Sequence, residues 1–98
     1  MLSSKQRSFL KSKAAGLSDT IFIGKEGITS NVVQQLSEEL RANELVKGKI
    51  QNNADVSIAQ AAQQLAEQAE AEVVLTIGKK FVLYKANEEK KKIILPEG

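Results

Sequence analysis

Residues 20–30 of the chain read TIFIGKEGITS, and this stretch decides the fold. Its first four residues are apolar or β-branched, which is typical of a short buried strand. Gly24-Lys25-Glu26-Gly27 then interrupts the pattern, and a helix is predicted from about residue 30 to residue 43. Thr29, Ser30 or Asn31 can cap its N-terminus. A strand that leads through a short loop into a helix indicates an α/β domain.

The pattern extends in both directions from this stretch. A helix is predicted over residues 3–15, capped by Ser3 or Ser4 and ended by a left-handed Gly16. On the other side we expect a strand over residues 45–51, a helix over 57–70, and strands over 72–77 and 80–85 joined by a tight hairpin at Gly78-Lys79. Helical crossovers favour parallel pairing of some strands. The fold class is therefore an α-β-α-β-α-β-β sandwich of two or three layers, with a four-stranded mixed sheet.

The spacing of apolar residues predicts which side chains are buried. In the strand over residues 45–51, alternation places Val46, Gly48 and Ile50 on one face and Lys47 and Lys49 on the other. The predicted core positions of the helical segments are Phe9, Leu10 and Leu17, then Val33, Leu36 and Leu40, then Ile58, Ala62 and Leu65.

Phe9 and Phe22 are both assigned to the core because they sit in apolar patterns. The chain therefore offers few aromatics for base stacking, and contacts to a nucleic-acid backbone and its shape are favoured.

Composition narrows the function classes. The chain of 98 residues contains no cysteine and no histidine, so disulfides, thiolate metal sites and the commonest general base are excluded. We expect no enzyme activity, no cofactor, no metal and no small-molecule substrate.

The chain offers no apolar run long enough for a membrane span and no secretory signal, so a cytoplasmic, monomeric protein is expected. Residues 1–86 form the predicted domain, and residues 87–98 a charged tail that could dock or add an edge strand.

Charge is segregated along the chain although the net charge is only +2. Residues 1–17 carry basic side chains and no acid, residues 50–72 carry acids and no base, and residues 73–85 are basic again. This segregation predicts opposed basic and acidic surfaces, and a basic surface attracts phosphate backbones.

The segment Gly24-Lys25-Glu26-Gly27 is the most informative short motif. Gly24 and Gly27 would let the backbone approach a phosphate closely, and Lys25 would add a charge beside the N–H groups of the following helix. The alternative is an ordinary tight turn between a strand and a helix. The segment lacks the spacing of a Walker loop.

Further lysines could extend a phosphate-binding ridge. Lys47 and Lys49 project from one strand face and could act together with Arg7, Lys11 or Lys25. The alternative is that strand lysines only keep an exposed edge solvated. Lys79 and Lys80 lie at the predicted hairpin tip, where charged residues are common.

Together these segments resemble the CRM domain family, in particular its small stand-alone bacterial members of the YhbY type. The resemblance covers about residues 3–95 and rests on blocks at residues 4–10, 23–29, 44–50 and 77–85, in the right order. It implies a fold similar to the C-terminal domain of translation initiation factor three. It also implies RNA binding, with association to precursors of the large ribosomal subunit.

The resemblance places the glycine loop of the family on Gly24 to Gly27 and its basic surface on Arg7, Lys11, Lys25, Lys47 and Lys49. The chain departs from the family pattern in three places. Glu26 puts an acid inside the loop, Gly48 replaces a larger residue, and Lys85 replaces a common arginine.

The sequence thus predicts a non-catalytic protein that binds ribosomal RNA or a large-subunit precursor. Lys25 and the loop backbone would meet phosphates, the other basic residues would orient the domain, and RNA shape would supply specificity. The alternative hypothesis is a protein-interaction adaptor on the ribosome that uses the acidic surface of the third helix, around Glu67 and Glu70.

Overall fold

The computed structural model describes residues 2–51, 57–87, 89 and 93–97. Within them the elements are helix α1 (Ser4–Ala14), strand β1 (Ile21–Ile23), helix α2 (Ser30–Asn43), strand β2 (Leu45–Ile50), helix α3 (Ile58–Ala69), and strands β3 (Glu72–Ile77) and β4 (Lys80–Tyr84). This order confirms the predicted α-β-α-β-α-β-β succession, and no boundary differs from its predicted position by more than one residue.

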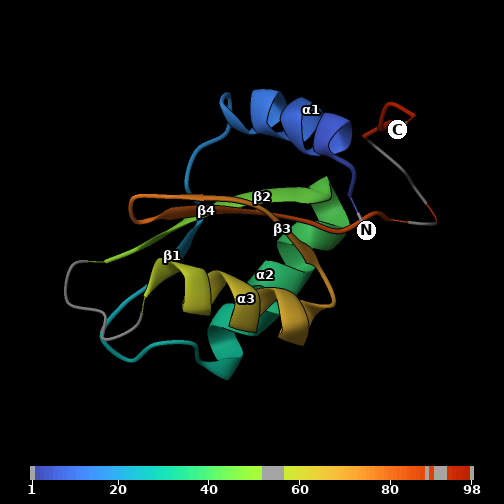
Figure 1. Cartoon of the computed structure of the whole chain (residues 1–98). Coiled ribbons are helices and arrows are strands. Elements are labelled where there is room, and N and C mark those ends of the chain that lie inside the picture. Colours follow the sequence, from blue (N-terminus) through green and yellow to red (C-terminus); the bar gives the residue numbers. More distant parts are fainter. Residues whose placement is uncertain (1, 52–56, 88, 90–92, 98) are drawn as a thin grey trace.

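The strands form one mixed sheet in the order β1-β2-β4-β3 (Figure 1). β1 pairs with β2 in parallel, since α2 carries the chain back between them, and the other neighbours are antiparallel. Gly78 has a φ of 58° at the first central position of the β3–β4 hairpin, where a glycine is tolerated best. The mixed sheet and the tight hairpin are both as predicted.

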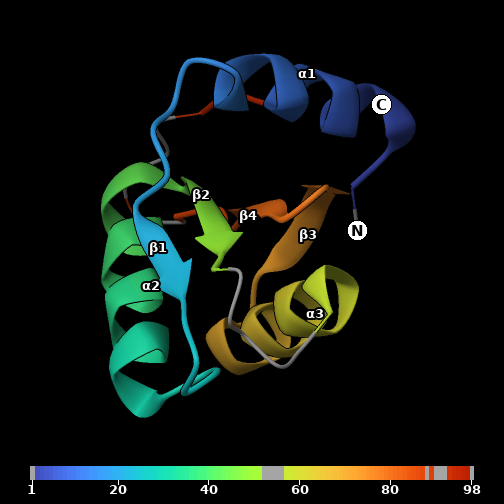
Figure 2. The same cartoon turned by 90° about the vertical axis from the view of Figure 1, so that its left-hand side faces the viewer.

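Helices cover both faces of the sheet. Figure 2 shows α2 and α3 on one side and α1 on the other, so the described residues build a three-layer sandwich. The larger core joins α2 and α3 to Ile21, Ile23, Val46, Ile50 and Phe81. A smaller core lies under α1 and contains Leu10, Leu45, Val74, Val82 and Tyr84. The strand alternation predicted for β2 is therefore confirmed.

Each helix begins at a capping side chain. Ser3 and Gln6 form a capping box at the start of α1, and Thr29 and Ser57 accept backbone N–H groups at the starts of α2 and α3. The predicted end of the first helix is wrong in detail. The cap residue is Ala15 in the right-handed conformation, and Gly16 does not adopt a positive φ. The turn that follows leaves Leu17 39% exposed, so its assignment to the core is also wrong.

Phe22 is the larger correction to the predicted core. Its neighbours Ile21 and Ile23 are fully buried against α2 and α3, whereas Phe22 is 49% exposed. Because side chains alternate along a strand, Phe22 points to the face that carries α1. α1 packs against β2 and β3, so β1 at the sheet edge remains uncovered there.

The described part of the tail is attached to the domain. Glu44 is fully buried with a φ of 66°, and its carboxylate accepts the N–H groups of Asn87 at 2.7 Å and Ile93 at 2.8 Å. The Gln6 side chain donates to the carbonyl of Pro96 at 3.1 Å. Ile93 and Leu95 pack against the core under α1 as an irregular segment and not as a strand. The predicted run of charges at residues 88 and 90–92 lies outside the described residues.

Gly48 has a packing reason at the centre of the sheet. It lies opposite Phe81 in the β2–β4 register. A Cβ atom added there would lie 2.3 Å from Phe81 Cζ and 2.7 Å from the carbonyl oxygen of Ile21. The large buried ring of Phe81 therefore occupies the space that a side chain at position 48 would need.

We predict that Gly48→Ala lowers the free energy of unfolding by about 1–3 kcal/mol through overpacking, and that the loss is smaller in a Phe81→Leu background. Urea unfolding of the single and double variants measures this. Gly16→Ala is the matched control, because the nearest atom to its added Cβ is 3.8 Å away. Equal losses in both backgrounds would assign the clash to the Ile21 carbonyl alone.

Candidate nucleic-acid interface

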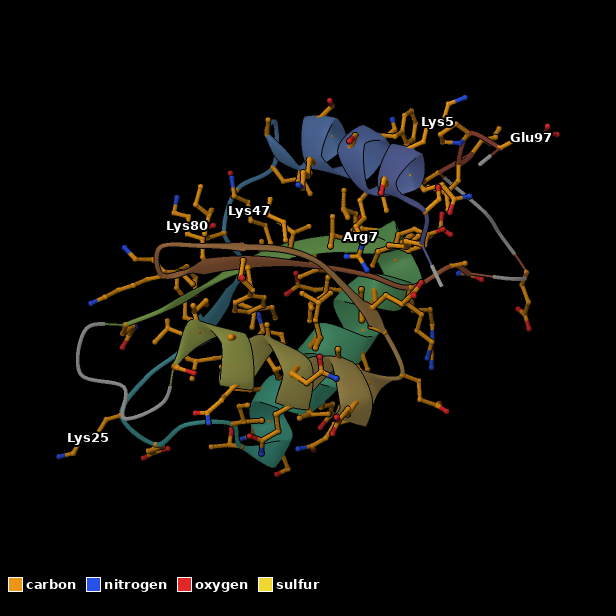
Figure 3. All side chains as sticks on the ribbon, in the orientation of Figure 1. Lys5, Arg7, Lys25, Lys47, Lys80 and Glu97 are labelled. Atoms are coloured by element: carbon orange, nitrogen blue, oxygen red, sulfur yellow. The ribbon has the colours of Figure 1, made fainter. Side chains whose placement is uncertain are left out.

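The predicted phosphate-binding residues fall on separate parts of the structure. Figure 3 shows Lys47 and Lys80 on the side of the sheet that carries α1, while Lys25 projects from the far lower corner of the same view. Arg7 lies between α1 and the sheet. The structure therefore does not gather these side chains into one ridge.

The sheet lysines form the closest group. Lys47 and Lys49 lie on the face opposite α2 and α3, and Lys49 is paired with Lys80 in the β2–β4 register. Lys49 and Lys80 are exposed and Lys47 is half-buried. Within the described part of the chain, Lys47 and Lys49 make no ion pair, whereas Lys80 Nζ lies 3.3 Å from Asp19 Oδ2. Two uncompensated cations therefore share this face.

Strand register extends this group into a line across the sheet. Phe22 lies opposite Lys49, Lys49 opposite Lys80, and Lys80 opposite Ile77. All these side chains are exposed, Phe22 by 49% and Ile77 by 66%. We call Phe22, Lys49, Lys80 and Ile77 the exposed row. The sequence pattern did not identify Phe22 and Ile77 as candidate binding residues. For Phe22, the alternation with Ile21 and Ile23 was the one signal that its side chain points away from the core.

The glycine loop is a tight turn at the end of β1. The N–H of Gly27 donates to the carbonyl of Gly24 at 3.0 Å, and Gly27 has a φ of 75°, which favours glycine. Lys25 and Glu26 are both exposed. The Thr29 side chain accepts the N–H of Val32 at 3.3 Å, so one donor at the start of α2 is already satisfied. Lys25 can therefore meet an anion from solvent. The negative charge of the neighbouring Glu26 weakens the attraction of an anion to the loop.

The β3–β4 hairpin and the loop lie at the same end of the sheet. The N–H of Ile50 donates to the carbonyl of Lys79 at 2.8 Å, and the N–H of Gln51 donates to the carbonyl of Ile23 at 2.8 Å. The end of β2 thus bridges the hairpin tip and the start of the loop. Figure 3 nevertheless shows Lys80 and Lys25 on different sides of the sheet.

Arg7 has a structural partner. Its guanidinium donates hydrogen bonds to the carbonyl oxygens of Val73 and Val74 in β3. These bonds fasten α1 to an edge strand, beside a register shift between Val73 and Leu75. Lys11 on the same helix is exposed.

Lys85, where the family pattern has arginine, also has a structural contact. Its Nζ donates to the carbonyl of Ala69 at 3.1 Å, where a cation complements the C-terminal end of α3.

Lys47 also lines a hollow of about 520 Å³ beside the start of β2. Lys13 at the end of α1 and Glu39 on α2 line the same hollow. Glu39 accepts hydrogen bonds from Thr20 and Gln35, and the N–H of Thr20 donates to the carbonyl of Lys47 at 2.9 Å, so this carboxylate reaches from α2 to the segment that precedes β1. The hollow is therefore lined by two lysines and by one carboxylate.

The titratable side chain of Tyr84 is buried in the smaller core under α1. Burial raises the pKa of Tyr84 above its ordinary value of 10.0, and the charges of Glu44 and Glu72 raise it further, so the phenol stays neutral in the core. The described residues contain no group of acidic side chains placed to hold a metal ion. The helices of the described part of the chain include none that is long and apolar enough to cross a membrane.

The fold and this open, lysine-bearing face define a small layered α/β domain with a surface suited to polyanions. The family model of the CRS1 / YhbY (CRM) domain matches residues 2–85. The chain belongs to this family, which confirms the resemblance seen in the sequence.

Relatives match along nearly the whole chain. "Probable RNA-binding protein YqeI" of Bacillus subtilis is 38% identical over 96 residues, which cover 98% of this chain and 100% of that protein. An RNA-binding protein of Haemophilus influenzae is 32% identical, covering 92% of this chain and 91% of the relative. The solution structure of a Staphylococcus aureus protein, described as a candidate RNA-binding protein, matches with a TM-score of 0.82 at 34% identity, covering 98% of this chain and all of that one.

We predict that Arg7 and Lys11 differ in their effect on stability. Arg7→Lys should lower the free energy of unfolding by about 1–3 kcal/mol, because an ammonium cannot reproduce the bonds to both carbonyls. Lys11→Ala should stay within about 0.5 kcal/mol of the parent protein. Urea unfolding measures both. A neutral Arg7→Lys variant would show that the guanidinium bonds to β3 contribute little.

Proposed function

We propose that this chain is a non-catalytic RNA-binding protein that associates with ribosomal RNA in precursors of the large subunit. The observation that carries the proposal is the pairing of Lys49 with Lys80, next to Lys47, on the part of the sheet that α1 leaves open. Membership of the CRM family and relatives named as RNA-binding proteins support RNA as the polyanion.

Phosphate binding would start at the sheet face. Lys47 and Lys49 lack an acidic partner within the described residues, so each can neutralise a phosphate and release a counterion. Lys80 forms an ion pair with Asp19, so it adds less positive charge to the phosphate-binding surface than Lys47 or Lys49 does. Lys79 at the hairpin tip and Lys11 on α1 extend the positive surface.

The loop would supply a separate contact. Lys25 lies apart from Lys47 and Lys80, so it would bind a different phosphate of the same RNA, with Gly24 and Gly27 allowing close approach of the backbone. Arg7 would act on the interface only indirectly, by holding α1 against β3.

Charge asymmetry supports a second candidate function. Glu67 and Glu70 are exposed at the C-terminal end of α3, on the layer opposite α1. A protein partner of the assembling ribosome could bind this acidic surface while RNA occupies the other side. This adaptor function would predict association that survives RNase treatment.

For a Lys47→Ala/Lys49→Ala variant we predict weaker RNA binding and a shallower salt dependence. Two lost phosphate contacts should reduce the slope of log K against log salt by about 1.4–1.8. Titration of a labelled ribosomal RNA fragment at several salt concentrations measures this. A Lys5→Ala/Arg41→Ala variant removes the same charge elsewhere and should keep the parent slope. If both variants lose slope equally, net charge and not this face determines binding.

The ribosomal assignment predicts where the protein sediments. In a sucrose gradient of cell lysate it should migrate with large-subunit precursors, and RNase or high salt should release it. Recovery at the top of the gradient under gentle conditions would contradict this assignment. Retention after RNase would favour the adaptor function through α3.

A further inference from the structure

The exposed row contains an aromatic ring in an unusual setting. Phe22 is 49% exposed between two isoleucines that are fully buried. Among the described residues no cation lies over its ring, whereas Lys13 Nζ lies 5.4 Å from the centroid of the Phe9 ring. Phe9 is half-buried and already capped in this way. Phe22 therefore presents the ring that is available to a ligand.

The surroundings of Phe22 remain open because α1 stops short. Under α1 lie Leu45, Val82 and Tyr84, which occupy the half of this face nearer the start of β2. In Figure 1 the β3–β4 hairpin extends beyond the end of α1, and the exposed row belongs to that uncovered half. Neighbouring strands lie about 5 Å apart, so the row places a ring, an ammonium group and a second ammonium group in sequence across the sheet.

A single exposed apolar side chain is common on protein surfaces and needs no ligand. Here the ring is followed by Lys49, which has no acidic partner within the described residues, and the row ends at Ile77, which is 66% exposed. A flat apolar ligand attached to a negative charge matches this order of groups. A nucleobase with its adjoining phosphate has this chemistry.

We propose that the exposed row is a stacking platform for an unpaired nucleobase of RNA. The base stacks on the Phe22 ring, Lys49 binds the adjoining phosphate, and Ile77 contacts the next base or sugar. Base pairs in a duplex hide their faces, so the platform selects single-stranded segments, loops or bulges. This inference rests on the proposed RNA-binding function and adds to it the kind of RNA that is preferred.

The platform also changes the physical basis of recognition. Stacking is nearly independent of salt, whereas phosphate contacts by Lys47 and Lys49 are strongly salt-dependent. Because every base has a π-face, stacking on Phe22 gives little sequence preference by itself. The chain would therefore distinguish unpaired from paired RNA more strongly than one base from another.

The test compares Phe22→Ala, Phe22→Leu and Phe22→Trp with Ile94→Ala, a control at another exposed apolar residue that is 84% exposed and outside the row. The probes are a labelled single-stranded RNA 12-mer and a labelled RNA duplex of equal length. Phe22→Ala and Phe22→Leu should weaken single-strand binding by roughly 5- to 150-fold with an unchanged salt slope. Phe22→Trp should retain single-strand binding. The affinity of all three Phe22 variants for the duplex should equal that of the parent protein, and Ile94→Ala should bind both probes as the parent protein does.

The outcomes separate this inference from the proposed function. If the parent protein binds RNA through Lys47 and Lys49 but Phe22→Ala binds the single strand equally well, the platform is overturned and RNA binding stands. If Phe22→Leu retains affinity, the contact is not stacking and the proposal fails. If the parent protein binds neither probe, both proposals fail. Circular dichroism melting of each variant verifies that the half-exposed position tolerates the change.

Discussion

The contact between Gly48 and Phe81 at the middle of the sheet constrains the rest of the structure. The ring fills the space where a Cβ of residue 48 would lie, so these two positions must face each other across β2 and β4. A slip of one residue in this register would turn every side chain of β2 to the opposite face. The lysines of β2 would then be buried under α2 and α3. The buried contact thus decides which residues reach the surface on the other side.

The extent of α1 decides how much of that surface remains open. Arg7 fastens the helix to β3 through backbone carbonyls, and Gln6 connects it to the tail at Pro96. Glu44 binds two further N–H groups of the tail from its buried position. These contacts hold the covering layer over one half of the sheet. The other half carries the lysines and Phe22, and it is the surface to which we assign RNA.

The near-neutral total charge of the chain conceals a clear separation of charges. Lysines lie on the open sheet face and in the loop, while Glu67 and Glu70 lie on α3 across the sheet. Such an arrangement orients the domain toward a polyanion without a large net charge. Stacking on Phe22 would add an attraction that salt does not screen, so the two contributions can be separated by experiment. The combination suits an RNA with both exposed backbone and unpaired bases.

The sequence by itself determined the order of elements, three candidate caps for α2 that include Thr29, the hairpin at Gly78 and the sidedness of Lys47 and Lys49. Each of these follows from local geometry, since caps, turns and the alternation of a strand depend on residues close in the chain. Only the tertiary structure decided that Phe22 is exposed, that Arg7 turns toward β3 and that Lys25 is separated from the sheet lysines. Those outcomes depend on which face a distant helix covers and how far it reaches. Local periodicity assigns a side chain to a face, but distant packing decides whether that face meets solvent.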